Sequence, residues 1–350
     1  MGRVNRGGSL LGGRYRLVDR LGKGGMSVVW RGYDEVLDRP VAVKVLDRRL
    51  AVDRAFRHQI RVEAQAAAQL CHPHITTVYD YGETVVSGVP VPYVVMELVN
   101  GVPLAARLAR DRVVPWREAV MVCAQVASAL AVAHRKGVVH RDVTPGNVML
   151  TAAGAKVVDF GISSLAGEND SGPEGTLLGT PGYVAPERIS GGQVSPATDV
   201  YSVGLVLYRM LTGRLPWQAG SVTEMLRAHL HADPGPLPPV PGLPTEVAEM
   251  CRRCLSKDPA QRPSSVDVAR QLAEAAGIVA PLATEETAEC AEPATTLPWA
   301  ATTDALPSPA RPRHSLGRRR IGPAVRTTMM GLLAVAALGR WREERGRGRR

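Results

Sequence analysis

Three oxygen-bearing side chains at short spacing could together bind a metal ion and move a proton. Asp142 and Asn147 lie in the polar loop 140–147, which reads HRDVTPGN, and Asp159 opens the triplet DFG seventeen residues after Asp142. The stretch 148–158 between them holds two short apolar runs and a turn, which predict a β-hairpin that brings the three side chains together. Asn147 and Asp159 suit Mg²⁺, which prefers oxygen ligands, and Asp142 would be free to accept a proton.

A lysine and a glutamate occupy apolar patterns in which a lone charge would be costly. Lys44 lies in the strand-like run 41–45, and Glu63 lies in a helix predicted over 55–70. The apolar stripe of that helix recurs at spacings of three and four and comprises Phe56, Ile60, Glu63, Ala67 and Leu70. A buried carboxylate must find a partner or take up a proton, so we expect an ion pair between Lys44 and Glu63. A solvated glutamate at the helix end is the alternative.

A glycine-rich turn joins two predicted strands near the start of the chain. Residues 21–28 read LGKGGMSV, and the run that follows is strand-like. Glycines let the backbone approach phosphates, and their amides can donate to phosphate oxygens. A dinucleotide-binding fingerprint would need a helix after the glycines, and a Gly-x-x-x-x-Gly-Lys-Ser/Thr loop is absent from the sequence. We therefore expect a hairpin that covers a nucleotide, with a merely flexible hairpin as the alternative.

The elements that must position these residues form a strand-rich region followed by a helix-rich one. Short β-type runs in the first region are 15–21, 28–33, 41–46, 76–81 and 93–96. From Leu104 onward helical spacings dominate, with one helix ending before Gly137. Residues 199–212 are apolar on nearly every face, which is typical of a helix inside a core. This order indicates an α+β architecture.

Together these motifs resemble a protein kinase catalytic domain, and the chain is most similar to the bacterial eukaryotic-type (Hanks-type) serine/threonine kinases. The resemblance runs in order over 15–276. It includes Asp199 in the apolar helix and the APE triplet that ends in Glu187. It implies the bilobal protein-kinase fold, and it implies a structural ion pair between Glu187 and Arg262.

The resemblance also implies a role for each candidate site residue. Lys44 would hold the α- and β-phosphates of ATP and would be oriented by Glu63. Asp142 would accept the proton of the substrate hydroxyl, while Asn147 and Asp159 would bind Mg²⁺. Further contacts to the nucleotide would come from the glycine-rich loop, the hinge and the adenine pocket, namely Leu21, Gly22, Lys23, Gly24, Gly25, Ser27, Val28, Ala42, Met96, Glu97, Val99 and Met149.

The segment before the APE triplet indicates the substrate class and its control. The resemblance implies protein substrates with Ser or Thr acceptors, because a Thr precedes APE as in serine/threonine kinases. We expect autophosphorylation of the polar loop 162–178, with a second copy of the chain as partner for reaction in trans. Arg141 could pair with the added phosphate. The candidate phosphorylation sites, in order of preference, are Thr176, Ser171 and Thr180.

Two positions depart from the kinase pattern. Ser27 replaces the third glycine of the loop, which is a mild change because serine is small. Thr144 stands where serine/threonine kinases usually have a lysine that contacts the transferring phosphate. The site therefore lacks one charge-assisted hydrogen bond, worth about 1.5–3 kcal/mol. We expect a slowed kinase, and the alternative is a weakly active or inactive pseudokinase that acts as a nucleotide-binding interaction scaffold.

The formal net charge of +10 arises at the end of the chain. Residues 311–350 contain twelve Arg and two Glu, and the residues before them sum to zero, so we expect no specific nucleic-acid binding. The stretch 321–340 is mostly apolar and approaches the about twenty residues that a membrane span needs. We expect a cytoplasmic kinase domain that associates with an anionic membrane through this stretch. A span, a peripheral surface helix and a disordered basic tail remain the three alternatives.

These patterns divide the chain into segments. We expect an N-terminal extension (1–14), a kinase domain (15–276) with a small β-rich N-lobe (15–97) and a larger α-helical C-lobe (102–276), a disordered linker (277–320), a candidate membrane segment (321–340) and a basic tail (341–350). The linker and the tail form a low-complexity C-terminal region. Cys251 and Cys254 have the spacing of a redox or zinc pair, but their apolar helical pattern favours buried core thiols.

Overall fold

The structure is a computed structural model that describes residues 10–160 and 181–277 of the 350-residue chain. The chain divides into two units, Met1–Thr295 and Thr296–Arg350, and every described residue lies in the first unit. Apart from Gly277, which ends the last helix, the predicted linker, membrane segment and basic tail lie outside the described residues.

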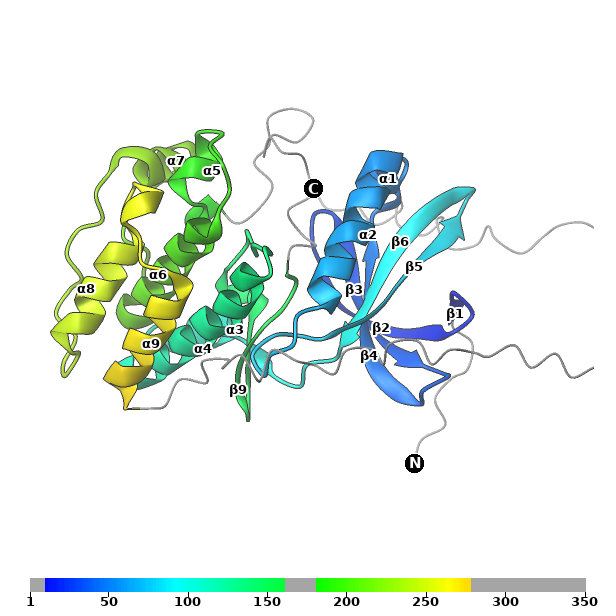
Figure 1. Cartoon of the computed structure of the whole chain (residues 1–350), viewed down its shortest axis with the longest axis horizontal. Coiled ribbons are helices and arrows are strands. Elements are labelled where there is room, and N and C mark those ends of the chain that lie inside the picture. The colour runs from blue at the N-terminus through cyan, green and yellow to red at the C-terminus, as the bar shows by residue number, and fades with distance from the viewer. Residues whose placement is uncertain (1–9, 161–180, 278–350) are drawn as a thin grey trace, which may run out of the picture. The chain divides into compact units, whose positions relative to one another are not determined.

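The N-terminal part is a six-stranded antiparallel sheet with the strand order β1-β2-β3-β4-β6-β5 (Figure 1). Its strands are β1 (Leu10–Leu11), β2 (Tyr15–Lys23), β3 (Ser27–Asp34), β4 (Arg39–Leu46), β5 (Val78–Val86) and β6 (Val89–Glu97). Each predicted strand run has a counterpart here. β5 and β6 extend further than predicted and meet at Ser87 and Gly88, whose φ angles of 51° and 81° suit a tight hairpin turn.

Two helices pack on this sheet: α1 (Arg48–Ala51) and α2 (Arg54–Ala68). The carboxylate of Asp53 caps α2 by accepting a hydrogen bond from the amide of the second helical residue. The helix predicted over 55–70 is therefore confirmed, with its end two residues early. Ile60 and Ala67 of the expected apolar stripe are buried, whereas Glu63 is only half-buried.

The two faces of the sheet bury different clusters because side chains alternate along each strand. Val41 and Val43 of β4 belong to a cluster of strand residues on one face. Ala42 lies on the opposite face and packs against Ala64 of α2. Lys44, two residues after Ala42, therefore shares the face that α2 covers, and it is only 4% exposed. The sheet and α2 thus hold this lysine in a buried setting.

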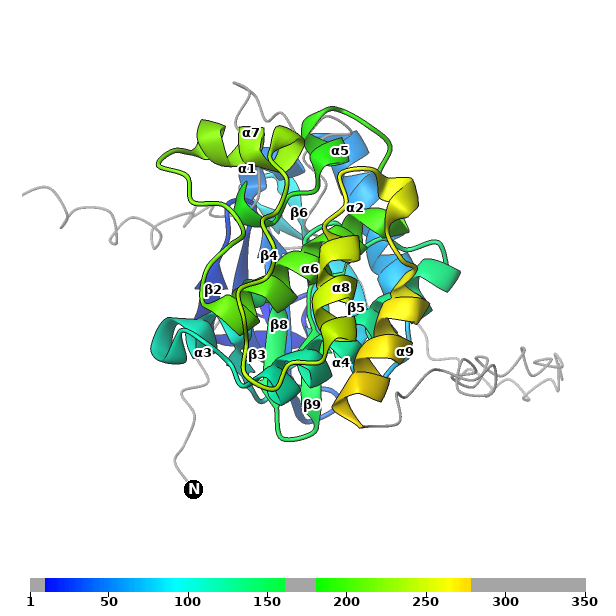
Figure 2. The same ribbon diagram turned by 90° about the vertical axis from the view of Figure 1, so that its left-hand side faces the viewer.

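The C-terminal part is mainly helical, with one small sheet (Figures 1 and 2). Its helices are α3 (Leu104–Asp111), α4 (Trp116–Arg135), α5 (Pro186–Ile189), α6 (Pro196–Thr212), α7 (Val222–His231), α8 (Thr245–Cys254) and α9 (Ser265–Ala276). The small sheet has the order β7-β8-β9, with β7 (Val102–Pro103), β8 (Val148–Thr151) and β9 (Gly154–Val157). Three short 3₁₀ helices in the described residues are η1 (Pro145–Asn147), η2 (Pro181–Tyr183) and η3 (Pro259–Gln261).

Helix α6 lies inside the helical core, where it contacts α4, α8 and α9 (Figure 2). It begins at Pro196 rather than at residue 199, because Ser195 and Thr198 form a capping box and proline suits the first turn. Gly213 ends it in the left-handed conformation, at φ 73°. The expectation of a buried helix is confirmed, and the core that surrounds it anchors the loops of the site described below.

One helix in the described ranges, α4, is long and apolar enough by length and composition to cross a membrane. Its mean hydropathy is 1.3, but 72% of the apolar window is buried inside the fold. Helix α4 packs against α6, α9 and β9. We therefore interpret it as a core helix of the C-terminal part.

The cysteines of α4 and α8 are buried core thiols, as the apolar pattern predicts. Cys123, Cys251 and Cys254 are free and buried. A side-chain carbon added to Gly204 of α6 would lie 2.7 Å from Cys254 Cβ, so glycine permits α6 and α8 to approach closely. In the described ranges, no cluster of three or more His, Cys, Asp or Glu could hold a metal ion.

Candidate active site

The β8–β9 hairpin brings the predicted metal ligands to one end, as expected. Val148 of β8 pairs with Val157 of β9, and the amide of Val158 donates to the Asn147 carbonyl at 3.0 Å. Asn147 Nδ2 also donates to Asp142 Oδ2 and to the Asp142 carbonyl, both at 2.8 Å. The side-chain amide of Asn147 therefore fixes the carboxylate of Asp142 and leaves its own carbonyl oxygen for another ligand.

The polar loop before Asp142 is anchored to the buried helix α6. Asp199 is fully buried, and its carboxylate accepts hydrogen bonds from the amides of His140 at 2.8 Å and Arg141 at 2.7 Å. His134 of α4 contacts the same carboxylate at 2.8 Å. Arg141 has a φ of 68°, a conformation that costs energy for a residue other than glycine and needs such support. Burial of α6 thus fixes the backbone that carries Asp142.

Two further contacts hold this loop from other sides. The ring of His140 contacts the Val158 carbonyl at 3.0 Å and packs edge-on against Phe160 at 4.7 Å between centroids. Arg188 of α5 donates a hydrogen bond to the Arg141 carbonyl. The loop that carries Asp142 is therefore joined both to the strand that leads to Asp159 and to helix α5, which begins within the APE triplet.

Glu63 does not pair with Lys44 in the described part of the chain. Lys44 Nζ lies 3.2 Å from Asp159 Oδ1, whereas Glu63 Oε2 is buried with no hydrogen-bond partner. Burial raises the pKa of Glu63 to about 7, although Arg141 and Lys44 act in the opposite direction. The expectation of a Lys44–Glu63 ion pair is wrong for this structure. The sequence patterns correctly predict the strand that carries Lys44 and the helix that carries Glu63. They do not predict that Asp159 lies next to Lys44.

The glycine-rich turn forms the hairpin between β2 and β3, and the Gly24 amide donates to the Ser27 carbonyl at 2.9 Å. A side-chain carbon added at Gly22 or Gly25 would meet no heavy atom within 4 Å, and one at Gly24 would meet only Ser27, from 3.8 Å. Leu21 and the three glycines are exposed. The space beside this backbone is open, as a loop that covers phosphates requires.

The residues expected around adenine come from both parts of the chain. Ala42 and Met96 face each other across β4 and β6 and are nearly buried. Val28 lies in β3, and Met149 lies in β8 of the small sheet. The amide of Glu97 donates to the Thr77 carbonyl at 2.9 Å, so this amide is not available to a base.

The structural ion pair expected from the APE triplet is present and buried. Arg262 donates to both carboxylate oxygens of Glu187, at 2.8 Å each, and Thr198 adds a third hydrogen bond at 2.8 Å. Burial is the largest single influence and would raise the pKa of Glu187, but the hydrogen bonds and the charge of Arg262, together with the Thr198 hydroxyl, outweigh it and the pKa is lowered. Glu187 therefore keeps its charge, and the pair joins α5 to the segment before α9.

Thr144 is 6% exposed and precedes η1, with its carbonyl accepting a hydrogen bond from the Asn147 amide at 3.0 Å. It therefore contributes to the turn through its backbone. The candidate phosphorylation sites Thr176, Ser171 and Thr180 lie outside the described residues.

Sequence reasoning gave no role to three residues that support the site. His134 joins Asp199 to Ser265 of α9, Arg188 supports the polar loop, and Lys156 forms an ion pair with Glu97. The signal for His134 was its position among the inward residues of a helix. Lys156 and Arg188 carried no comparable signal, because their partners are distant in sequence.

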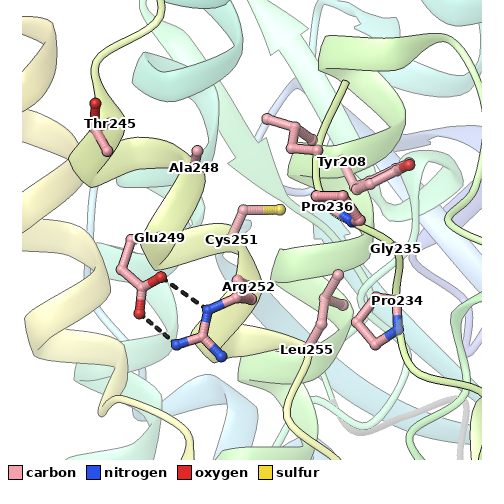
Figure 3. Close-up of a pocket in the computed structure, with 11 residues that line it drawn as sticks. Tyr208, Pro234, Gly235, Pro236, Thr245, Ala248, Glu249, Cys251, Arg252 and Leu255 are labelled. Carbon is pink, nitrogen blue, oxygen red and sulfur yellow. Dashed lines mark hydrogen bonds and ion pairs between the residues drawn. The ribbon is translucent and has the colours of Figure 1, made fainter. Parts of the chain in front are cut away.

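A pocket of about 420 Å³ lies elsewhere in the C-terminal part, between α6, α8 and the segment 234–237 (Figure 3). Tyr208, Cys251 and Leu255 contribute to its walls, and Arg252 and Glu249 form an ion pair at it. None of the predicted catalytic or nucleotide-binding residues lines this pocket.

Comparison with known proteins agrees with this geometry. The family model described as protein kinase domain matches residues 15–274. The chain is 42% identical to the serine/threonine-protein kinase PksC of Streptomyces coelicolor over 75% of this chain and 49% of that protein. It is 42% identical to the serine/threonine-protein kinase PknA of Mycobacterium tuberculosis over 73% of this chain and 60% of that protein.

A solved structure shares the fold. The kinase domain of Mycobacterium tuberculosis PknI, crystallised as a point mutant, matches with a TM-score of 0.59 and 29% identity, over 77% of this chain and 100% of that one. The chain spans about half of PksC and 60% of PknA. The fold is the protein-kinase fold, with a β-rich N-terminal region and a helical C-terminal region. The chain therefore belongs to the protein kinase family, in its bacterial Hanks-type serine/threonine branch.

Proposed function

We propose that the chain transfers the γ-phosphate of ATP to serine and threonine hydroxyls of proteins. The observation that carries this proposal is the cluster at the end of the β8–β9 hairpin. There Asn147 fixes the Asp142 carboxylate, and Asp159 lies beside the buried Lys44. The relatives named as serine/threonine-protein kinases support the substrate class.

The residues present fit a magnesium ion. Asn147 uses its amide nitrogen on Asp142 and retains a carbonyl oxygen, and Asp159 supplies a carboxylate. Magnesium is usually held by one or two such oxygens together with substrate phosphates and water, which agrees with the small number of ligands here. When bound with ATP, the ion would neutralise charge on the phosphates.

The candidate site supplies a proton acceptor and a phosphate-binding lysine for the proposed transfer. Asp142 would accept the proton from the attacking hydroxyl, because Asn147 holds its carboxylate in one orientation. Lys44 would bind the α- and β-phosphates, and the open backbone at Gly22 and Gly25 would cover them. Positioning and charge stabilisation account for most of the catalysis in such a transfer.

The pseudokinase alternative rests on Thr144 alone, and we do not favour it. Asn147 contacts Asp142 and Lys44 contacts Asp159, so the site keeps its candidate proton acceptor, both candidate metal ligands and its candidate phosphate-binding lysine. Loss of one charge-assisted hydrogen bond slows a reaction without abolishing it.

We propose residues 15–276 as the kinase domain, and autophosphorylation in trans at Thr176, Ser171 or Thr180 with Arg141 as the cation that binds the phosphate. Incubation of the full chain with ATP and Mg²⁺, followed by mass mapping of phosphosites, tests both the activity and these positions. We expect phosphate within 162–180 in the wild type and none in Asp142→Asn. Identical maps for the two proteins would refute the proposal.

A further inference from the structure

An ion pair joins the hinge to the strand that leads to Asp159. Lys156 of β9 donates to both carboxylate oxygens of Glu97, at 2.8 and 2.6 Å. The two side chains are 20% and 26% exposed, so they are only partly solvated. Glu97 is the last residue of β6, where the chain leaves the large sheet, and Lys156 lies three residues before Asp159.

Backbone hydrogen bonds reinforce this junction. The segment 74–77 runs alongside β9: the Val157 amide donates to the His74 carbonyl at 2.8 Å, and the Thr76 amide donates to the Val157 carbonyl at 3.0 Å. The next residue, Thr77, accepts a hydrogen bond from the Glu97 amide at 2.9 Å. Strand β9 and the end of β6 are thus connected through one short segment, and the Lys156–Glu97 pair spans the junction directly.

The Lys156–Glu97 pair lies between two regions of the candidate nucleotide site. The segment 97–99 is the expected hinge, whose backbone would meet adenine. The open end of the β8–β9 hairpin, opposite its turn, carries the candidate metal ligands Asn147 and Asp159. Glu97 is tied through its backbone amide and its side chain, so its remaining backbone freedom is small. Within the described residues, the carboxylate of Glu97 would keep only a long contact of 3.4 Å, from the Thr77 amide, if Lys156 were removed.

We propose that Lys156 is a positioning residue that acts through Glu97 to hold the hinge in the orientation that binds adenine. This inference rests on the proposed nucleotide site. In this view the pair lowers the cost of ordering the hinge when a nucleoside binds, because the hinge is already fixed before binding. Lys156 would act without touching the phosphates, so its contribution should be the same for adenosine as for ATP.

The test is a double-mutant cycle read by calorimetric titration of the full chain with adenosine. The variants are Glu97→Gln, Lys156→Met and the two combined. We expect each single variant to weaken adenosine binding about five-fold, and the double variant to be no weaker than either single one. Lys156→Arg, which keeps the charge, should stay within about two-fold of wild type. In transfer assays the KM for ATP should rise by the factor seen for adenosine, with kcat nearly unchanged.

An ion pair away from the hinge provides the matched control. Arg61→Met removes the ion pair with Glu83 between α2 and β5, at 3.1 Å, and should leave adenosine affinity unchanged.

The proposed role of Lys156 would be overturned if Glu97→Gln and Lys156→Met bound adenosine as tightly as wild type. It would also be overturned if the two losses of affinity added in the double variant. A loss seen with ATP but not with adenosine would show a phosphate contact instead. Glu97→Gln barely changes side-chain size, so it decides the matter if Lys156→Met does not fold. Adenosine binding needs no phosphotransfer, so this outcome is independent of the proposed activity.

Discussion

Burial disfavours the charged form of the Glu63 carboxyl group in the candidate site. One of its oxygens is buried with no hydrogen-bond partner among the described residues, and burial raises its pKa from 4.5 to about 7. A carboxylic acid with a raised pKa is partly protonated near neutral pH. In this arrangement Glu63 weakens the fold at high pH, and Lys44 is held by Asp159. Retaining a destabilising carboxyl group is typical of functional sites, where activity and stability conflict.

Glu63→Gln should therefore stabilise the nucleotide-free protein at high pH. Between pH 4.5 and 7 the native state binds more protons at Glu63 than the unfolded state, so this group lowers stability as pH rises through that window. We expect the variant to gain about 1–3 kcal/mol over wild type on going from pH 5 to pH 8. Urea unfolding at both pH values measures the gain, and a pH-independent difference would contradict this account.

Thr144 allows a gain-of-function prediction. A lysine at this position would restore one charge-assisted hydrogen bond to the transferring phosphate, worth about 1.5–3 kcal/mol. We expect Thr144→Lys to raise kcat by roughly ten-fold, with the KM for ATP little changed. Thr144→Ser, which adds no charge, is the control and should leave kcat near wild type. A fall in kcat for the lysine variant would show that the buried threonine is needed for the turn.

At the scale of elements, the sequence predicted the hairpin, the capped helix α2 and the buried helix α6, because each depends on local periodicity and turn residues. It missed the first half of β6, where Pro90 and Pro92 argue against a strand. Among the described strands, that half pairs with β5 alone, since β4 pairs with β6 from Tyr93 to Glu97. One edge of it therefore has no partner among these strands, and proline is tolerated there.

The buried pair Glu187–Arg262 should dominate the stability of the helical part. Arg262→Met would leave the buried Glu187 carboxylate without its cation, supported by the Thr198 hydroxyl and a backbone hydrogen bond, which costs about 3–5 kcal/mol. The combined variant Glu187→Gln/Arg262→Met should recover part of this loss, since no charge is then buried. Arg252→Met, which breaks the exposed pair with Glu249, is the control and should cost less than about 1 kcal/mol. Equal losses in urea unfolding for Arg262→Met and Arg252→Met would contradict this assignment.

At the scale of the whole molecule, the order of motifs sufficed to predict the fold and to nominate candidate residues for the site. Among contacts between segments far apart in sequence, the Glu187–Arg262 pair was expected from the resemblance, but the partners of other supporting residues could not be predicted. Lys44 with Asp159, Lys156 with Glu97, and Arg188 with the Arg141 carbonyl each join segments far apart in sequence. The first two contacts depend on how the two parts pack, and the third depends on packing within the C-terminal part; local periodicity encodes neither.

The charge distribution leads to a prediction for the full chain. Since residues 311–350 carry the whole formal excess of +10, we propose that they bring the protein to an anionic membrane. The full chain should co-sediment with phosphatidylserine vesicles, and a variant that ends at residue 310 should not. Binding that survives high salt would favour a span over 321–340, whereas release by salt would favour an electrostatic surface contact. Equal sedimentation of both proteins would exclude this role.

Single-turnover transfer of labelled phosphate tests the central claim most directly. The full chain is mixed with a limiting amount of γ-labelled ATP, Mg²⁺ and a protein acceptor, and transfer to Ser and Thr is followed in the wild type and in Asp142→Asn. The variant keeps the size of the side chain but removes the carboxylate that Asn147 holds at 2.8 Å. We predict transfer by the wild type and a loss of at least about 100-fold in the variant. Transfer at the same rate in both proteins would contradict the assignment of Asp142 as proton acceptor and, with it, the proposed kinase activity.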